Sequence, residues 1–223
     1  MKSAGNDIVS LSRVNKQRTG QFNFYSKILS IPEQELYPNQ QFSKLSFVNY
    51  VWLLWSVKES AYKYLKRFIP ALKFTPTKFV IQQIEIFTKP FNKRENSQWK
   101  SDKTSESYYR GKVIFESHSL YFRSKISDEW IATVVNDTID FENVWWGMQA
   151  IDETNPYHQS KAAKNLLLNK LNSFFTKEIH IGNSSIGFPI ILKDSDDLNI
   201  PVSLSHDDCF VAYSFLLNPL NNN

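Results

Sequence analysis

The sequence predicts an α+β fold of two similar halves, each a long helix packed on a small antiparallel sheet, in a pseudo-two-fold arrangement. Two segments with helical periodicity predict the helices, and each is followed by short runs typical of strands. The charge also changes along the chain: residues 1–149 hold 21 Lys and Arg against 14 Asp and Glu, and residues 150–223 hold 5 against 8. We therefore divide the chain into residues 1–149 and 150–223.

The first half opens with a predicted strand at residues 4–9. Residues 12–29 are mostly polar but place their apolar residues at helical spacing, and Pro32 with Glu33 restarts a turn or a helix. From residue 46 to 67, apolar residues recur over a wide arc with no interrupting proline. This pattern predicts a central and largely buried helix.

Strand-like runs rich in Val, Ile and aromatic residues follow this helix. The first run, at 78–88, leads into a polar and charged segment, 89–107, that is typical of a loop. Three further runs at meander spacing predict an antiparallel sheet, and they lie at 108–117, 118–126 and 130–136.

The second half repeats the order of a helix and then strands. Residues 157–175 return to helical periodicity, with leucines and phenylalanines on one side. Residues 179–192 and 201–215 predict at least three short strands, the last two joined by a turn at Asp207 and Asp208. We expect the tail at 219–223 to be frayed.

Composition favours a globular protein in a reducing compartment. Apolar residues make up 42% of the 223 residues and aromatic residues 15%, well above the level of disordered chains. The single cysteine, Cys209, excludes an internal disulfide and a cysteine-based metal site. Because the longest apolar run, near 51–57, is far shorter than the roughly 20 residues of a membrane span, we expect a cytoplasmic protein with no membrane partner.

Two acidic residues stand in apolar surroundings. Asp7 lies within the predicted strand beside Ile8 and Val9, and Glu59 lies in the middle of the apolar helix with Lys63 four residues on. A carboxylate in such a place must be solvated, hydrogen-bonded or metal-bound. Glu59 and Lys63 can form a simple helix ion pair. Two carboxylates from separate elements are also what Mg²⁺ prefers, together with water and substrate phosphates.

A third candidate feature is the run from Val202 to His206. Alternation along a strand puts Ser203 and Ser205 on the face opposite Val202 and Leu204, with His206 near the strand end. Hydroxyl, imidazole and backbone N–H groups at such a corner can cradle a phosphate. The pattern by itself is weak, since a lone surface histidine is usually without a special role.

Taken together, these motifs resemble those of the 4'-phosphopantetheinyl transferase superfamily. GNDIV near the start resembles the G-[IV]-D-[IVL] motif of that family, and WSVKESAYK (55–63) resembles its W-x-x-K-E-[SA]-x-x-K motif. PVSLSHDDCFVAYSF resembles the third motif, a strand that ends in Ser-His. The motif order leaves two alternatives: the long surfactin-synthetase-activating type with its halves exchanged, or an enlarged holo-carrier-protein synthase, a type that forms trimers. The helix before the Ser-His strand favours the first alternative, and with it a monomer.

The resemblance implies a role for each candidate residue. It implies that Asp7 and Glu59 hold Mg²⁺ and that Glu59 and Lys63 act in catalysis. It further implies coenzyme A binding by Ser205, His206, Lys161, Lys164 and Lys58. The chain departs from the family pattern at two positions. Val9 replaces a second acid found in long-type enzymes, and Phe188 replaces a basic residue before proline.

The activity implied is transfer of phosphopantetheine from coenzyme A to a serine of an acyl or peptidyl carrier protein in lipid or polyketide biosynthesis. The products are the holo carrier and 3',5'-ADP, and either Glu59 or a metal-bound water is the general base. The alternatives are a catalytically silent relative that binds a carrier protein or coenzyme A, and an unrelated metal-dependent phosphotransferase or nuclease. A nuclease more often shows clustered acids and a larger basic patch, so we expect no nucleic-acid partner.

Overall fold

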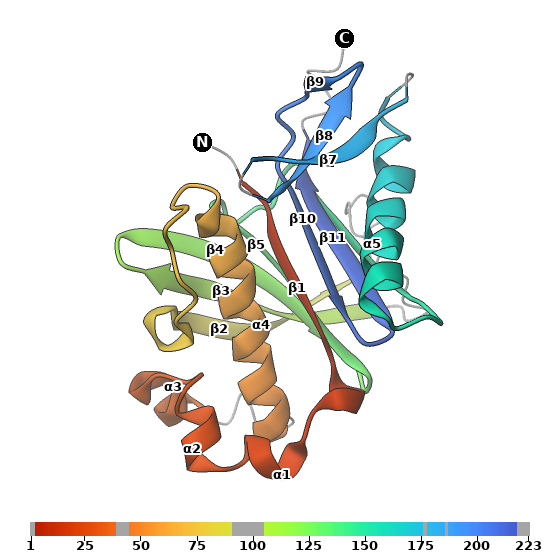
Figure 1. Ribbon diagram of the computed structural model, residues 1–223. Coiled ribbons are helices and arrows are strands. Elements are labelled where there is room, and N and C mark those ends of the chain that lie inside the picture. The colour runs from red at the N-terminus through yellow and green to blue at the C-terminus, as the bar shows by residue number, and fades with distance from the viewer. Residues whose placement is uncertain (1–2, 39–44, 91–104, 176–177, 186, 218–223) are drawn as a thin grey trace.

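A computed structural model describes residues 3–38, 45–90, 105–175, 178–185 and 187–217 of the chain (Figure 1). The helices are η1 (Leu11–Arg13), α1 (Lys16–Thr19), α2 (Phe22–Tyr25), α3 (Ile31–Leu36), α4 (Phe47–Lys66), η3 (Pro76–Lys78) and α5 (Pro156–Leu171). The strands are β1 (Gly5–Ser10), β2 (Val80–Pro90), β3 (Ser105–Phe115), β4 (His118–Ile126), β5 (Trp130–Asn136), β6 (Val144–Ala150), β7 (His180–Asn183), β8 (Pro189–Lys193), β9 (Asp196–Asp197), β10 (Val202–Asp207) and β11 (Phe210–Leu216).

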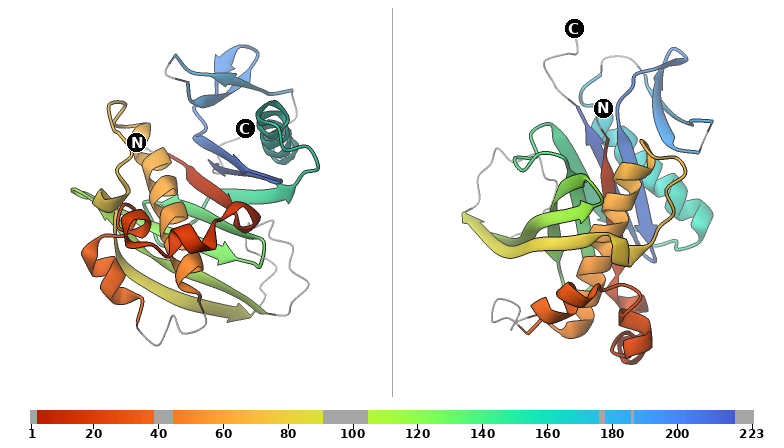
Figure 2. Two further views of the ribbon diagram at one scale, coloured as in Figure 1. Left: turned by 60° about the horizontal axis from the view of Figure 1, so that its bottom comes forward. Right: turned by 90° about the vertical axis from the view of Figure 1, so that its left-hand side faces the viewer.

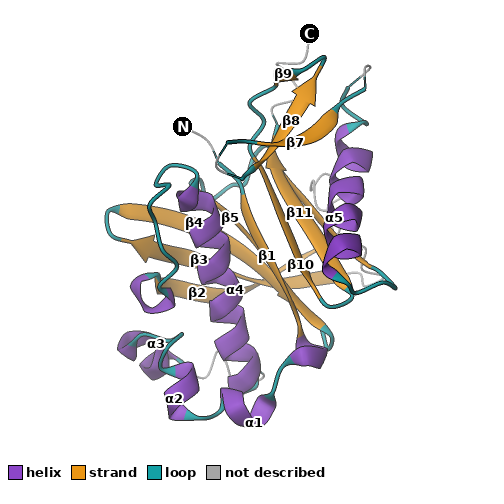
Figure 3. Ribbon diagram, viewed as in Figure 1, coloured by secondary structure: helices purple, strands orange, loops and turns teal. Residues whose placement is uncertain are grey.

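The larger sheet has five antiparallel strands in the order β1-β5-β4-β3-β2, with β1 at one edge. Helix α4 lies across one face of this sheet (Figure 3). Its buried side chains and those of the sheet form the main hydrophobic cluster, which includes Val51, Leu54, Phe79 and Phe122. The burial of this apolar surface makes the main favourable contribution to the free energy that holds α4 on the sheet.

The second sheet has three antiparallel strands in the order β10-β11-β6. Helix α5 packs on it through Leu167 and Leu171, which contact Val202 and Phe215 in a separate cluster. Strand β6 ends at Ala150, so nearly all of it belongs to the first predicted half, and it nevertheless pairs with β11. A division at residue 150 therefore separates β6 from the other strands of its sheet.

β1 connects the two sheets, which is why all six of its residues are buried. On one face it packs against α4, and on the other Ile8 joins Ala132, Phe210 and Ala212 in a small cluster between the sheets. Helices α4 and α5 lie on the same side of the molecule, with β1 and β10 between them (Figures 1 and 2). The remaining strands, β7-β8-β9, form a small sheet beyond the end of α5.

Short polar signals in the sequence explain where the helices begin. The side chain of Ser46 accepts a hydrogen bond from Asn49 N at the start of α4, and that of Asn155 accepts one from His158 N at the start of α5. α3 begins with a capping box between Ser30 and Glu33. No helix in the described ranges is long and apolar enough to cross a membrane.

The mixed α/β class with antiparallel sheets agrees with the sequence-based prediction. The helices predicted at 46–67 and 157–175 are α4 and α5, and α5 ends four residues earlier, at Leu171. Strands β2 and β3 extend into both ends of the predicted loop at 89–107, and its central part lies outside the described residues, as does the predicted frayed tail. The pseudo-two-fold relation between the halves stays a prediction. The two sheets that the helices cover differ in size, since one has five strands and the other three.

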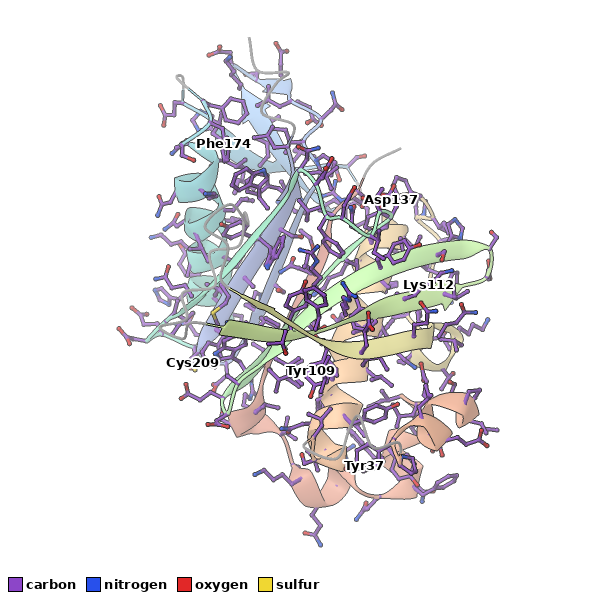
Figure 4. All side chains as sticks on the ribbon, turned by 180° about the vertical axis from the view of Figure 1, so that it is seen from behind. Tyr37, Tyr109, Lys112, Asp137, Phe174 and Cys209 are labelled. Carbon is purple, nitrogen blue, oxygen red and sulfur yellow. The ribbon has the colours of Figure 1, made fainter. Side chains whose placement is uncertain are left out.

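Cys209 lies in the turn between β10 and β11 and is partly exposed (Figure 4). The turn comprises Asp208 and Cys209, one residue later than predicted, and Asp208 has a positive φ of 50°. Asp is among the residues that tolerate this left-handed conformation. The turn therefore brings β11 back along β10 in the register that places Ser205 opposite Ala212.

The close approach of β1 to α4 depends on Gly5. A Cβ atom added at Gly5 would lie 2.2 Å from the backbone oxygen of Ser60 and 2.9 Å from Tyr64 Cβ. We predict that Gly5→Ala lowers the free energy of unfolding by about 1–3 kcal/mol or more, because overpacking at backbone atoms cannot be relieved by a side-chain rotation. The control is Gly20→Ala, where the nearest atoms lie 3.7 Å away. Thermal unfolding that shows equal changes for the two variants would contradict this packing.

Candidate active site

β1 directs the side chain of Asp7 toward α4. Alternation along the strand turns Asn6 and Ile8 to the second sheet, and Asp7 and Val9 to the helix. Asp7 is 6% exposed, and its Oδ1 accepts a hydrogen bond of 3.0 Å from Lys63 Nζ. The first motif therefore places one buried carboxylate at the contact between β1 and α4.

α4 contributes Glu59 and Lys63, one helical turn apart. Glu59 Oε1 lies 3.6 Å from Lys63 Nζ, so the predicted helix ion pair is present. The ion pair is also part of a cluster of three charged side chains, because Lys63 Nζ bonds Asp7 as well. Lys63 thus lies between two carboxylates from different elements, and its side chain is 25% exposed.

The burial of these groups changes their acidity. Burial raises the pKa of Glu59 above its usual value, and the Asp7 carboxylate raises it further, while Lys63 opposes the change. Burial by itself would lower the pKa of Lys63, but the two carboxylates outweigh it and raise that pKa. When all three are ionised, the group carries one excess negative charge, which favours a bound cation.

The second oxygen of Asp7, Oδ2, is buried and has no hydrogen-bond partner among the described residues. A buried carboxylate oxygen left without a partner is costly, and in native proteins it usually indicates a bound ion or water. Within the described ranges no group of three or more His, Cys, Asp or Glu residues could hold a metal ion. Asp7 and Glu59, both ion-paired with Lys63, are only two carboxylates, and this donor set fits an ion such as Mg²⁺, which takes one or two carboxylates together with water and phosphate oxygens.

β10 approaches β1 through hydrogen bonds between the two motif-bearing strands. Ser205 Oγ accepts a bond of 2.7 Å from Asn6 Nδ2, and Ser203 Oγ accepts one of 3.2 Å from Asn6 N. Asp207 Oδ2 accepts a bond of 2.8 Å from Ser10 N. Both serine side chains are buried on the face predicted by alternation. Their hydroxyl groups join the strands and do not line an open surface.

His206 lies on the opposite face of β10 and is exposed. The pKa of His206 is lowered first by the partial burial of its ring and then by the positive charge of Lys63, which Asp207 partly opposes. Ser205 and Asp207, on either side of His206, bond β1, and Lys63 is near enough to His206 to affect its acidity. The structure therefore brings Asp7, Glu59, Lys63 and His206 into one region within a single chain.

A family model described as the 4'-phosphopantetheinyl transferase superfamily matches residues 3–134, more than half of the chain. The chain belongs to this superfamily. No curated protein and no solved structure matches the chain. The match includes the motifs around Asp7 and Glu59, and the Ser-His strand lies beyond it. Membership in this superfamily implies phosphopantetheinyl transfer, with coenzyme A as substrate and a carrier protein as acceptor.

The two lysines predicted to bind coenzyme A in this transferase lie on α5. Lys161 is exposed and Lys164 is partly buried. α5 covers the β10 face that carries Val202, and it lies on the same side of the molecule as α4 (Figure 2). The hydrogen bond of 2.7 Å from Gln159 Nε2 to Asp208 O ties the beginning of α5 to the turn that follows His206.

Lys58 requires a correction. Its side chain is fully buried, and its Nζ lies 2.6 Å from Glu33 Oε2 and 2.6 Å from the carbonyl oxygen of Ile28. An ammonium group that is 0% exposed and bonded to Glu33 and Ile28 is not accessible to coenzyme A, so Lys58 does not belong to the transferase's substrate site. The spacing of Ser30 and Glu33 could have identified Glu33 as a helix cap, but no local signal links Glu33 to Lys58.

The sequence analysis also missed Arg67, which connects the halves of the transferase. Its guanidinium group donates a hydrogen bond of 3.0 Å to Pro189 O and another to Val202 O. The same group lies over the ring of Phe188, 5.3 Å from its centre. The position at which the resemblance implies a basic residue before proline is therefore an aromatic ring in contact with Arg67, which caps the end of α4.

The raised pKa of Glu59 gives a prediction for stability. In the folded protein ionisation of Glu59 is disfavoured, so its folded-state pKa lies above that of an unfolded glutamate. Below the unfolded pKa, Glu59 is protonated in both states and costs no stability. As pH rises through the folded pKa, the free energy of unfolding falls, because the unfolded state ionises more readily. In EDTA, Glu59→Gln should therefore raise the melting temperature near pH 8 and change it little near pH 4, below the unfolded pKa of about 4.3. A variant that is no more stable than wild type near pH 8 would contradict the burial of this charge.

Proposed function

We propose that the protein transfers the phosphopantetheine arm of coenzyme A to a serine of an acyl or peptidyl carrier protein and releases 3',5'-ADP. The observation that carries the proposal is the buried and unpaired Asp7 Oδ2, beside Glu59 and Lys63 at the contact between β1 and α4. A carboxylate oxygen without a partner suits a divalent cation that brings phosphate oxygens with it.

In this proposal Asp7 and Glu59 hold Mg²⁺, which supplies charge stabilisation for a pyrophosphate. Lys63 binds a phosphate oxygen and keeps the excess negative charge of the site small. The other coordination positions are filled by water and substrate, since Val9 faces the hydrophobic cluster and has no ligand atom. The chain thus contributes two ligands and one cation.

The reaction requires a proton acceptor near the attacking serine. The carrier serine Oγ loses its proton, forms a bond to the β-phosphorus of coenzyme A, and the bond from that phosphorus to 3',5'-ADP breaks. Glu59 and a water molecule are the candidate acceptors.

The second half binds the remote end of coenzyme A in this proposal. His206 on β10 and Lys161 and Lys164 on α5 hold the 3'-phosphate. The hydrogen bond from Gln159 to Asp208 O, which ties the beginning of α5 to the turn after β10, supports this assignment. Ser205 contributes by holding β10 against β1, since its hydroxyl bonds Asn6. We also propose that the protein acts as a monomer, because both motif-bearing strands meet within one chain.

The direct test is incubation with coenzyme A, Mg²⁺ and candidate apo carrier proteins, followed by mass spectrometry of the carriers. A phosphopantetheine adduct on one serine, with equal release of 3',5'-ADP and loss of both in EDTA, is the expected result. Binding of a carrier without any adduct would instead identify a catalytically silent relative. The excess of basic residues in the first half favours an acidic carrier surface as the partner.

We predict that Asp7→Ala and Glu59→Ala each lower the rate of transfer at least 10²-fold, roughly the effect of losing one electrostatic element of a site. The control is Glu85→Ala, which removes an exposed acid that pairs with Arg110. The rates are measured at saturating Mg²⁺ with the folded state checked by circular dichroism. Activity above about a tenth of wild type in either site variant would exclude that residue as a metal ligand.

The second half is tested with 3'-dephospho-coenzyme A, which lacks the group that His206 and Lys161 are proposed to hold. Wild type should use it poorly. His206→Ala and Lys161→Ala should raise KM for coenzyme A more than they lower kcat, because binding remote from the reacting atoms appears in KM. Both variants should also discriminate less between the two donors. A large loss of kcat in His206→Ala, with unchanged KM and donor preference, would show instead that His206 takes part in the chemistry.

A further inference from the structure

A buried ion pair lies directly beside the carboxylate group of the site. Lys58 immediately precedes Glu59 on α4, and its side chain and that of Glu33 are both 0% exposed. Lys58 Nζ donates to Glu33 Oε2 and to Ile28 O, each at 2.6 Å. The pair is therefore shielded from water and cannot touch a substrate or a metal.

Glu33 is bonded to more than one element through its two carboxylate oxygens. Oε1 accepts a bond of 2.8 Å from Ile81 N on β2, and Oε2 accepts one of 2.8 Å from Ser30 N at the start of α3. The backbone oxygen of Glu33 accepts a bond of 2.7 Å from Tyr50 OH on α4. One acidic residue thus connects α3, β2 and two points on α4, including Lys58.

Stability alone does not require charges at this place. A buried ion pair can often be replaced by apolar side chains of similar volume without loss of stability. Charge-assisted hydrogen bonds, however, fix direction and distance, whereas apolar burial is not directional. What the pair adds to the surrounding hydrophobic cluster is a defined orientation of α4.

The orientation of α4 decides where Glu59 and Lys63 lie. Rotating a helix about its axis by roughly 20° moves each Cα by about 0.8 Å, and side-chain atoms by more, since Cα lies about 2.3 Å from the axis. A displacement of this size in a catalytic group can cost about 10²-fold in rate. Asp7, on β1, does not move with the helix, so the rotation would separate it from Lys63.

We propose that the Lys58–Glu33 pair is a positioning device that sets the rotation of α4, so that Glu59 and Lys63 meet Asp7 and its metal. This inference rests on the proposed function. It gives the lysine of the WSVKESAYK motif a role away from the substrate. It also gives the segment between β1 and α4 a role at the site, since that segment supplies Glu33.

The test replaces both charges with neutral groups of similar size, in the double variant Lys58→Met with Glu33→Gln. Affinity for Mn²⁺ is measured by electron paramagnetic resonance, and kcat and KM for coenzyme A are measured on the same samples. The double variant should fold, bind Mn²⁺ about 10-fold more weakly and lose about 10-fold in kcat, as for other residues that orient metal ligands. KM for coenzyme A should change less than kcat. Lys58→Arg with Glu33 intact should restore part of the Mn²⁺ affinity.

The control is Trp52→Phe, which removes an indole N–H that bonds Thr19 Oγ1 from another face of α4 and leaves the pair and its partners intact. It should lower the melting temperature without changing Mn²⁺ affinity, which separates positioning from stability. A folded double variant with wild-type Mn²⁺ affinity and kcat would overturn the inference. If the double variant does not fold, Glu33→Asp shortens the acid and keeps its charge. Weaker Mn²⁺ binding in that variant supports the inference, and unchanged binding overturns it.

The same experiment distinguishes failure of the proposed function from failure of the positioning role. A folded wild-type protein that binds no Mn²⁺ and transfers nothing would contradict the proposed function, and with it the positioning role. Wild-type activity and Mn²⁺ binding together with an unaffected double variant would contradict the positioning role alone.

Discussion

The contact between β1 and β10 is the constraint on which the site depends. The side-chain and backbone nitrogens of Asn6 bond Ser205 and Ser203, and Ser10 N bonds Asp207, so the strand of the first motif is joined to the strand of the third. These buried hydrogen bonds are specific in direction and costly to break singly. With the strands held this way, the residues on their other faces, Asp7 and His206, come into one region between α4 and α5.

The charges at the candidate site are not arranged for maximal stability. Asp7, Glu59 and Lys63 are partly removed from water, and Asp7 Oδ2 has no partner among the described residues. A buried carboxylate oxygen without a partner is costly in the free protein, and under the proposed function a cation and phosphate oxygens would offset that cost. The buried Lys58–Glu33 pair differs, because its polar atoms are matched by hydrogen bonds from neighbouring elements. Adjacent residues of one motif therefore serve different purposes.

Features with local causes could be predicted from the sequence, and features that depend on distant partners could not. The periodicity of 46–67 identified α4, and alternation placed Ser203 and Ser205 on one face of β10. The burial of Lys58 depends on Glu33, 25 residues away in another element, and nothing near Lys58 in sequence signals it. The pairing of β6 with β11 is likewise set by the way the sheets pack.

The most direct test of a site built within one chain is a mixing experiment with two impaired variants, Asp7→Ala and His206→Ala, assayed at a low concentration of coenzyme A. Each chain then lacks one side of the site. Because β1 and β10 of the same chain form the site, the mixture should show only the sum of the two separate activities. Recovery of transfer well above that sum, in a sample that forms oligomers, would show that the two sides come from different chains and would contradict this account.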